Sequence, residues 1–592
     1  MYNYGLVGNC HVSALISSRG SVDWLCLPRP DSEPVFGQLL DNEGGRFSID
    51  LAKEQPATSR QHYLENTNVL VTTVETAAGD AFQITDFCPR FPQFGRMYRP
   101  LALFRIVEPL KGHPEIRVSC HPIRGWNKEP AAMARGSTHL RFDIRNEPLR
   151  LLTTMPVTHL CDEHAFPLRE KIYFALSWGV NVEDDLVEVA ERFLRLTCNY
   201  WRSWVKNCSI PSQFQKETIR SALTLKLHCF EDSGAILAAL TTSLPEDPGG
   251  VRNWDYRYCW LRDAYFVLTA LHNLGHFEEM EGFVTFLLNL AFSDAFSMQQ
   301  VRPVYSLDLR APLPEIAHMH WQGFASSKPV RTGNQAAEHV QNDVFGEMVL
   351  TLAPIFFDER FIHLRTRDHE RLLENFGRAC AQSISQPDAG LWEHRQGWKE
   401  HTFSNLMCWA GLERLERIKQ AGYLRTTELN FSSEKDRAAK AVRAAVVDGA
   451  LRNSPTDTSL DAALALLPVL RFPDQALALR TITTIRKRLS VEGHEDGAFF
   501  YRYLRTDDFG MPGSAFVVCS FWIAQALAAV GQREDAAQLL ARALTCSNGV
   551  GLLSEHYLPA QRQHYGNFPQ AYSHVGVINA AFAVSTPWSE VL

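Results

Sequence analysis

After Pro211 the sequence carries about twelve stretches in which apolar residues recur at helical spacing, separated by long irregular loops. These stretches are 216–230, 263–274, 277–292, 335–355, 366–383, 402–420, 434–449, 458–467, 474–488, 514–531, 534–546 and 570–584. Twelve helices in about 380 residues fit a closed double ring of six inner and six outer helices, although an open α-solenoid has the same local pattern. No repeat of fixed period is visible, which counts against a simple array.

The first 180 or so residues have a different pattern. Short strand-like segments alternate with turns rich in Gly, Pro, Asn and Asp, for example at 68–76, 101–108, 140–144 and 171–178. This pattern predicts an antiparallel β-sandwich. From Val182 apolar residues return at helical spacing with acidic residues in front of them, which predicts a connecting helix. We therefore expect a β-sandwich domain over 1–181, a linker helix over 182–210 and a helical domain over 211–592.

Composition narrows the class of protein. The chain has 592 residues. A single hydrophobic core usually stops growing at roughly 250–300 residues, so more than one domain is expected. Its hydrophobic fraction of 45% excludes general disorder. With 66 acidic and 59 basic side chains the formal net charge is −7, which argues against a nucleic-acid partner.

The sequence also bounds the compartment. The N-terminus lacks a basic segment followed by a long apolar one, and no stretch of 18 uncharged apolar residues is present, so we expect no membrane span. The 13 cysteines include no Cys-x-x-Cys pair, and several lie in apolar runs. Such a set is typical of buried free thiols in a reducing cytoplasm.

In a helical ring the loops at one end converge on the axis, so chemistry is expected there. The loop Gly249–Asp263 holds three Arg, two Asp and four Trp or Tyr in fifteen residues. Arginine and aspartate can hydrogen-bond vicinal hydroxyls of a pyranose while aromatic rings cover its apolar faces. The alternative is an Arg–Asp network that only holds the loop in place.

Two carboxylates stand out in other loops. Glu393 follows Trp392 at a turn marked by Gly390, before the predicted helix 402–420. An aromatic neighbour would desolvate Glu393 and raise its pKa, as a general acid requires, although a solvated surface glutamate is the default for a lone Glu. Glu555 is flanked by apolar and aromatic residues. Two such residues on loops entering one ring indicate the acid–base pair of a glycosidase.

The remaining motifs are weaker. Lys328–Asn334 forms another polar loop before a predicted helix. His318 and His320 have the residue type of metal ligands, but no third ligand follows at a diagnostic spacing. The sequence has no Gly-x-Ser-x-Gly elbow, no phosphate-binding loop and no dinucleotide fingerprint. We therefore expect neither a metal nor another cofactor.

Taken in this order, the loops resemble glycoside hydrolase family 15, the glucoamylases and their bacterial trehalase-like relatives, over nearly the whole chain. The most specific segments are Arg252–Asp263, Leu391–Glu393 and Gly566–Gln570. Residues 4–9, 20–32 and 44–47 are similar to the β-sandwich domain of the bacterial members. The resemblance implies an (α/α)6 barrel behind a β-sandwich and inversion at the anomeric carbon.

The resemblance also implies roles for single residues. Glu393 matches the general acid and Glu555 the general base, which an inverting enzyme holds roughly 6.5–9.5 Å apart. Arg262 and Asp263 match the pair that holds the non-reducing glucose. The full set of candidate substrate-binding residues is Tyr256, Trp260, Arg262, Asp263, Trp392 and Asn334.

The sequence departs from the bacterial members at four places. Glu555-His556-Tyr557-Leu558 stands where an acidic pair and a nearby Asp are usual, Gly513-Ser514-Ala515-Phe516 where many carry Glu-Gly-Ala-Phe, Ser404-Asn405 where Ser-Lys is common, and Gly323–Ser326 in place of Gly-Tyr-Arg-Gly. Because both candidate catalytic glutamates are retained, these departures bear on the substrate rather than on the reaction type.

The leading hypothesis is an inverting, exo-acting α-glucoside hydrolase that releases β-glucose from small α-glucosides or malto-oligosaccharides. The alternative is an α,α-trehalase of the same family. Further alternatives are an inverting sugar phosphorylase, against which Glu555 argues, and a catalytically silent sugar-binding relative, against which both glutamates argue. The expected partners are small α-linked glucose saccharides, and both a monomer and a homo-oligomer are compatible with the sequence.

Overall fold

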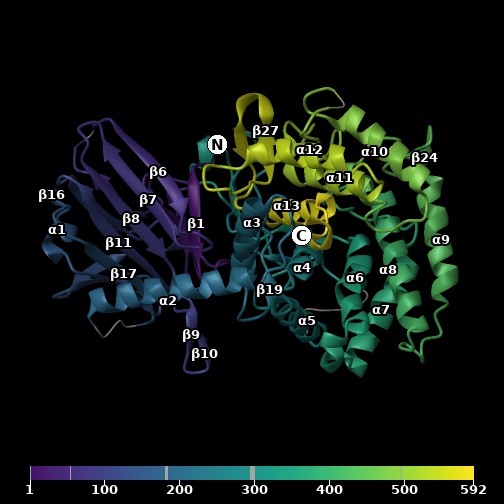
Figure 1. Cartoon of the computed structure of the whole chain (residues 1–592), viewed down its shortest axis with the longest axis horizontal. Helices are drawn as coiled ribbons and strands as arrows, with labels where there is room; N and C mark the ends of the chain where they lie inside the picture. The colour runs from purple at the N-terminus through teal and green to yellow at the C-terminus, as the bar shows by residue number, and fades with distance from the viewer. Residues whose placement is uncertain (1, 54, 181–184, 294–300, 495) are drawn as a thin grey trace.

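The computed structural model describes residues 2–53, 55–180, 185–293, 301–494 and 496–592. Strands and helices occupy two adjoining halves of the molecule, purple to blue and teal to yellow in Figure 1. The helix α2 (Leu186–Lys206) runs along the β half and leads into the helical half (Figure 1). We predicted this connecting helix from residue 182, and residues 182–184 of that prediction lie outside the described residues.

The β half contains two large antiparallel sheets and a two-stranded sheet of β9 (Phe91–Gln93) and β10 (Arg96–Tyr98). The eight-stranded sheet has the order β13 (Ala132–Arg135), β14 (His139–Asp143), β15 (Pro148–Thr153), β17 (Ile172–Trp178), β11 (Ala102–Lys111), β8 (Ala81–Phe87), β7 (Leu70–Thr76) and β6 (Ala57–Tyr63). The seven-stranded sheet has the order β1 (Tyr4–Gly8), β2 (Ser13–Ser17), β3 (Val22–Cys26), β5 (Arg46–Leu51), β12 (Glu115–His121) and β16 (Phe166–Pro167), with β4 (Pro34–Phe36) paired to β3.

The two sheets pack face to face over an apolar core. Phe47 of β5 and Phe174 of β17 meet edge to face with ring centroids 5.6 Å apart, which joins the two sheets directly. The helix α2 covers the outer face of the larger sheet, where Phe193 packs against Phe104 of β11. The predicted antiparallel sheet structure of the first half is thereby confirmed.

The helical half forms a closed ring. Its inner elements contact one another in the cyclic order α4 (Leu261–Leu274), α6 (Asp343–Phe357), α8 (Thr402–Gln420), η5 (Ala462–Leu466), α11 (Val517–Ala529) and α13 (Ala571–Val584), which returns to α4. Outside them lie α3 (Gln215–His228), α5 (Glu278–Ala291), α7 (Arg367–Ser383), α9 (Phe431–Ala444), α10 (Gln475–Leu489) and α12 (Arg533–Ala543). Since the contacts close, the ring and not the open solenoid is the architecture.

Burial separates the two layers of the ring. In α11 every residue from Val517 to Leu527 is buried, as expected for a helix surrounded by protein. In the outer helix α9 the buried residues lie on one stripe. The inner helices α6 and α8 approach so closely at Gly346 that an added Cβ would lie 2.0 Å from the carbonyl oxygen of Met407. Only glycine fits at this crossing.

Several predicted helices differ from the structure: the stretch 434–449 ends early, since α9 stops at Ala444 and the strand β24 (Val446–Val447) follows, and three others differ at their starts. The stretch 335–355 contains a short 3-10 turn, η3 (Gln335–Glu338), and α6 begins only at Asp343. The stretch 458–467 forms only the 3-10 helix η5, which Asp461 caps by accepting a hydrogen bond from the N–H of Ala463. The stretch 514–531 begins with the strand β26 (Ala515–Phe516) before α11. For η5 the side-chain cap at Asp461 fixes the helix start inside the apolar pattern, a signal that periodicity does not carry.

The two halves share polar contacts next to the loop Gly249–Asp263. Trp24 of β3 donates from Nε1 to the carbonyl of Leu240 at 2.8 Å. Arg257 is fully buried, pairs with Asp255 at 2.7 Å and donates to the carbonyl of Ser32 at 2.6 Å. The β half therefore makes contacts that hold this loop in place.

Within the described residues no helix is long and apolar enough to cross a membrane. All thirteen cysteines are free thiols, and all but Cys161 and Cys208 are buried.

Candidate active site

A pocket opens where the N-terminal ends of the inner helical elements converge. The volume of the pocket, including its open mouth, is about 840 Å³. Arg262 and Asp263 enter it from the first turn of α4, Glu393 from the loop before α8, and Glu555 from the loop before α13. Because α8 and α13 stand three places apart in a ring of six, the two glutamates reach the pocket from opposite sides of the ring. Helix N-termini favour negative charge, and the carboxylates gathered here benefit from that field.

Glu393 is held by three donors on one oxygen. Its Oε1 accepts hydrogen bonds from Trp260 Nε1 at 2.7 Å, Arg262 Nη2 at 3.0 Å and Gln341 Nε2 at 3.2 Å. Its backbone lies in the left-handed region with φ 61°, which costs a non-glycine residue on the order of 1–3 kcal/mol and is typical of functional sites. The side chain is 21% exposed, and Oε2 has no hydrogen-bond partner among the described residues. One oxygen is thus fixed while the other is free to meet a ligand.

Arg262 is almost fully engaged by protein. Besides Glu393, its guanidinium contacts the hydroxyl of Tyr572 at 3.1 Å, Asp343 Oδ2 at 3.3 Å and the side-chain oxygen of Gln341. With four of its five N–H groups directed at these partners, one N–H on Nη2 is left for a ligand. Arg262 therefore orients Glu393 at least as much as it can bind a sugar.

Asp263 has the opposite character. The residue is buried, yet no other described side chain donates a hydrogen bond to its carboxylate, which lines the pocket. Burial raises the pKa of Asp263 to about 7, although the charge of Arg262 opposes this shift. A ligand hydroxyl that donates to this carboxylate would restore a partner to a buried charge.

Glu555 lies at the end of a small sheet formed by β26, β27 (His556–Leu558) and β28 (Gln563–Tyr565). Its Oε2 accepts a hydrogen bond from the N–H of Asn567 at 3.2 Å, and the preceding Gly566 has φ 72°. A Cβ at Gly566 would lie 2.4 Å from Oε2, so only glycine allows the carboxylate this position. Burial, followed by the charge of Glu246, raises the pKa of Glu555.

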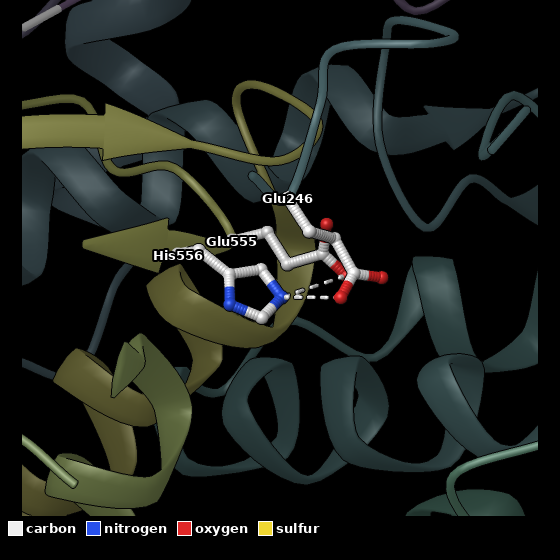
Figure 2. Close-up of side chains that lie close together, drawn as sticks. All are labelled: Glu246, Glu555 and His556. Atoms are coloured by element: carbon white, nitrogen blue, oxygen red, sulfur yellow. Dashed lines mark ion pairs between the residues drawn. The ribbon is translucent and has the colours of Figure 1, made fainter. Parts of the chain in front are cut away.

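Glu246, a residue that sequence reasoning missed, stands beside Glu555. Figure 2 shows Glu246, Glu555 and His556 with their polar ends directed at one another. Glu246 accepts hydrogen bonds from Trp254 Nε1 at 2.9 Å and from Arg502 Nη2 at 3.1 Å. Although burial opposes it, Arg502 and the other nearby cations lower the pKa of Glu246. The charge therefore stays on Glu246, while Glu555 holds its proton more readily.

The aromatic candidates line the pocket together. Tyr256 and Trp260 meet edge to face at 5.3 Å. Trp392 donates from Nε1 to Asp461 at 2.8 Å, and its ring packs against Phe516. These fixed rings offer apolar faces to a sugar.

Asn334 also lines the pocket, but both ends of its side-chain amide are already used by protein. Its oxygen caps η3 by accepting from the N–H of Ala336, and its nitrogen donates to the carbonyl of Asp255. Its predicted contact with substrate would have to be made around these bonds.

Trp254 also lines the pocket, and two arginines lie over its ring. Arg331 and Arg395 stack over it at 4.8 and 4.6 Å, and both pair with Glu315. Phe509 packs edge to face against Trp254 at 5.0 Å. Arg331 belongs to the polar loop 328–334 that the sequence singled out.

His318 and His320 do not converge on a common point. His318 contacts the hydroxyl of Thr332 at 2.9 Å and stacks on Trp126, whereas His320 contacts the carbonyl of Trp126. Among the described residues, the group of three with metal-ligand spacing is Glu246, Glu555 and His556 instead.

Three residues that position the glutamates carry no signal of their own in the sequence. Glu246, Gln341 and Arg502 stand singly in loops, without a motif that marks chemistry. Their common feature is a place in a loop that precedes an inner helical element, and this becomes informative only once the ring is known.

Comparison with known proteins agrees with this geometry. Residues 213–582 match the family described as Glycosyl hydrolases family 15. The chain belongs to glycoside hydrolase family 15. Residues 2–162 match a second description, Trehalase-like, N-terminal. The protein is therefore a glycoside hydrolase, as the two loop glutamates predicted.

Similar proteins cover the whole chain. A trehalase of Mycolicibacterium smegmatis is 32% identical over 98% of this chain and 91% of its own length. A trehalase of Mycobacterium tuberculosis is 31% identical over 98% and 89%, respectively. A crystal structure of a bacterial glucoamylase complexed with acarbose superposes with a TM-score of 0.67 at 13% identity, covering 98% of this chain and 94% of that chain. The last match confirms the predicted fold, a β-sandwich followed by an (α/α)6 barrel.

Proposed function

We propose that this glycoside hydrolase is an α,α-trehalase. The observation that carries the proposal is the match to two trehalases over 98% of the chain, β half included. The comparisons thus support the trehalase alternative better than our leading, glucoamylase-like hypothesis. The pocket supports the same reaction class, because two carboxylates reach it from opposite sides of the ring.

In the proposed mechanism Glu393 is the general acid. With Oε1 fixed by its three donors, a proton on Oε2 passes to the oxygen between the two glucose units as that C–O bond breaks. Glu555 is the general base, and its Oε1, which has no hydrogen-bond partner among the described residues, accepts a proton from the attacking water. The new C–O bond forms on the opposite face of the sugar, so that configuration inverts.

Asp263 and the remaining N–H of Arg262 are proposed to bind hydroxyls of the glucose that is attacked. Tyr256, Trp260 and Trp392 would cover its faces. Since Arg262 and Trp260 also hold Glu393, binding of this glucose and placement of the acid depend on the same side chains.

The products of trehalose test the proposal. Hydrolysis with inversion gives one β-glucose from the attacked unit and one α-glucose from the leaving unit. In H2¹⁸O, early proton NMR spectra should show equal amounts of both anomers, and mass spectrometry should find the label in one of the two glucoses. Two α-glucoses at early times would contradict the acid–base assignment. Glucose release from maltose but not trehalose would return the protein to the glucoamylase-like hypothesis.

We further propose that the substrates are small α-linked glucose saccharides met in a reducing cytoplasm. Thirteen free thiols support this compartment, because disulfides are rare there.

A further inference from the structure

Ser514 and His556 contact each other next to Glu555. The Oγ of Ser514 lies 3.1 Å from Nδ1 of His556, although the residues are 42 positions apart in the chain. The strand pairing between β26 and β27 brings them together, since Phe516 faces His556 in the register. Both side chains are buried.

The charges around the ring favour a hydrogen on Nε2 of His556, because this atom faces the carboxylates of Glu246 and Glu555. Nδ1 is then free to accept a hydrogen bond from the Ser514 hydroxyl at 3.1 Å, which also lies 3.4 Å from the carbonyl of Glu246. Burial lowers the pKa of His556 to about 3, which leaves the ring neutral with one N–H. With Nδ1 accepting, that N–H is on Nε2.

The Nε2 atom faces two carboxylates. It lies 3.6 Å from Glu246 Oε2 and 3.9 Å from Glu555 Oε1, as the dashed lines in Figure 2 mark. These distances exceed a direct hydrogen bond, but one water can bridge them. Among the described residues neither Nε2 nor Glu555 Oε1 has a hydrogen-bond partner, although both are buried. A buried donor and a buried acceptor are thus directed at the same place.

We propose that Ser514 and His556 form a positioning pair for Glu555: the hydroxyl fixes the imidazole tautomer, and the Nε2–H stabilises the ionised carboxylate through one shared water or by closing the gap. His556 acts through Glu555 and does not line the pocket itself. The inference rests on the proposed function, because it assigns His556 to the general base of that reaction.

A bound cation is the competing interpretation of this cluster. The ligand atoms of Glu246, Glu555 and His556 lie within 4.8 Å of one another. However, Arg502 and Arg252 approach Glu246 Oε2 at 3.1 and 3.8 Å. Two guanidinium groups at this carboxylate oppose a second cation and favour a neutral donor such as Nε2–H.

The groups that act on Glu555 come from several elements. They are Glu246 and Tyr256 in the loops before α4, Arg502 in the loop before β26, Tyr2 at the N-terminus and His556 on β27, while Arg252 acts on both Glu246 and His556. Of these, His556 is the neutral residue whose tautomer Ser514 controls, so it can be altered without changing a charge.

The test compares His556→Leu, His556→Gln and Ser514→Ala with the double variant His556→Leu/Ser514→Ala. Losing the donor destabilises the ionised carboxylate, so the acidic limb of kcat/KM on trehalose should move to higher pH by roughly one unit in His556→Leu. Gln retains a donor and should shift the limb less, and Ser514→Ala should give a smaller shift in the same direction. The double variant should match His556→Leu, because the two residues act as one unit.

A matched control is Ser520→Ala on α11, a buried serine whose hydroxyl, unlike that of Ser514, has no hydrogen-bond partner among the described residues. It should leave the acidic limb in place. If His556→Leu does not fold, Ser514→Ala and His556→Gln still carry the comparison. An unchanged limb in all folded variants, or shifts that add fully in the double variant, would overturn the pairing.

A second measurement separates this inference from the proposed function. Infrared titration of the Glu555 carboxyl, with Glu555→Gln as the reference, reports its ionisation without turnover. A shift of this titration in His556→Leu supports the positioning pair even if trehalose is not the substrate. Trehalose hydrolysis with an unshifted titration would support the function and refute the pair. Stoichiometric metal in the purified protein, lost in His556→Leu, would favour the cation instead.

Discussion

The sharpest consequence of the geometry concerns Glu393→Gln. The amide oxygen of Gln can still accept the three hydrogen bonds that Oε1 receives at 2.7, 3.0 and 3.2 Å, so the side chain should keep its place. Its NH2 group then takes the place of Oε2. An amide NH2 is not acidic enough to transfer a proton to the leaving oxygen. General acids contribute about 10²–10⁴-fold, which corresponds to about 3–5 kcal/mol of the barrier. We expect kcat on trehalose to fall by this factor with Tm unchanged.

The leaving group makes the prediction specific. A glucose alkoxide leaves poorly and needs the proton, whereas fluoride leaves α-glucosyl fluoride with little assistance. The kcat of Glu393→Gln on α-glucosyl fluoride should therefore fall by roughly tenfold or less. The kcat of Glu555→Gln should fall by roughly 10²–10⁴-fold on both substrates, because water must be deprotonated in either case. Released glucose and released fluoride are the two readouts.

The control is Glu338→Gln, which neutralises an exposed carboxyl on η3. It should behave as the wild type on both substrates. Equal losses on trehalose and α-glucosyl fluoride in Glu393→Gln would refute its role as the acid. If Glu555→Gln kept near-normal kcat on α-glucosyl fluoride and Glu393→Gln did not, the two roles would be exchanged.

Other substitutions test the surroundings of the pair. Asp263→Asn should lower kcat/KM by roughly 10- to 150-fold at nearly constant Tm, because a sugar hydroxyl loses a charged acceptor; a large loss of Tm without a selective kinetic loss would favour a structural role. Burial and the charge of Asp343 raise the pKa of Asp388 to about 8 from 3.8. Between pH 3.8 and about 8 the folded state therefore holds a proton that the unfolded state releases. The free energy of unfolding falls by up to about 1.4 kcal/mol per pH unit as pH rises through this range. Asp388→Asn should flatten that fall in Tm measured against pH, and an unchanged slope would contradict it. Arg257→Leu should lower the free energy of unfolding by about 3–5 kcal/mol, measured by denaturant titration, because Asp255 stays buried without its partner; a loss below about 1 kcal/mol would contradict this. Finally, kcat/KM per chain end should be higher for disaccharides than for soluble starch, and a clear preference for the polymer would contradict a pocket built for small sugars.

The fold was predictable from the sequence because its two halves have different periods. Strand alternation followed by helical spacing separates the β half from the ring, and the number of helical stretches matches a double ring. The inner helices 402–420 and 570–584 were predicted to within one residue, whereas the start of η5 was not, because the Asp461 cap begins it inside a continuous apolar pattern. The strand Ala515–Phe516 was missed for a related reason: its partner, His556, is about 40 residues away in sequence.

The same limit applies to the site. Glu393 and Glu555 could be found because local sequence marks them, with Trp392 before one and apolar residues around the other. Glu246 and Arg502 could not, because their importance lies in a contact between loops that are far apart in sequence. Sequence reasoning thus named the two candidate carboxylates, and the structure was needed for the groups that set their charge.

The loop Gly249–Asp263 shows how sugar-binding and structural interpretations can both hold. Asp255 and Arg257 form a fully buried pair, and Arg257 donates to the β half, so this part of the loop is the structural network. Asp263 has no side-chain partner among the described residues and faces the pocket. Arg262 stands between these two extremes, since it binds protein on nearly every N–H yet directs one of those bonds at Glu393. A single loop therefore joins the β half, which Arg257 contacts, to the candidate acid, which Arg262 contacts. By contacting this loop, the β half has a structural role in an enzyme whose candidate catalytic residues all lie in the ring.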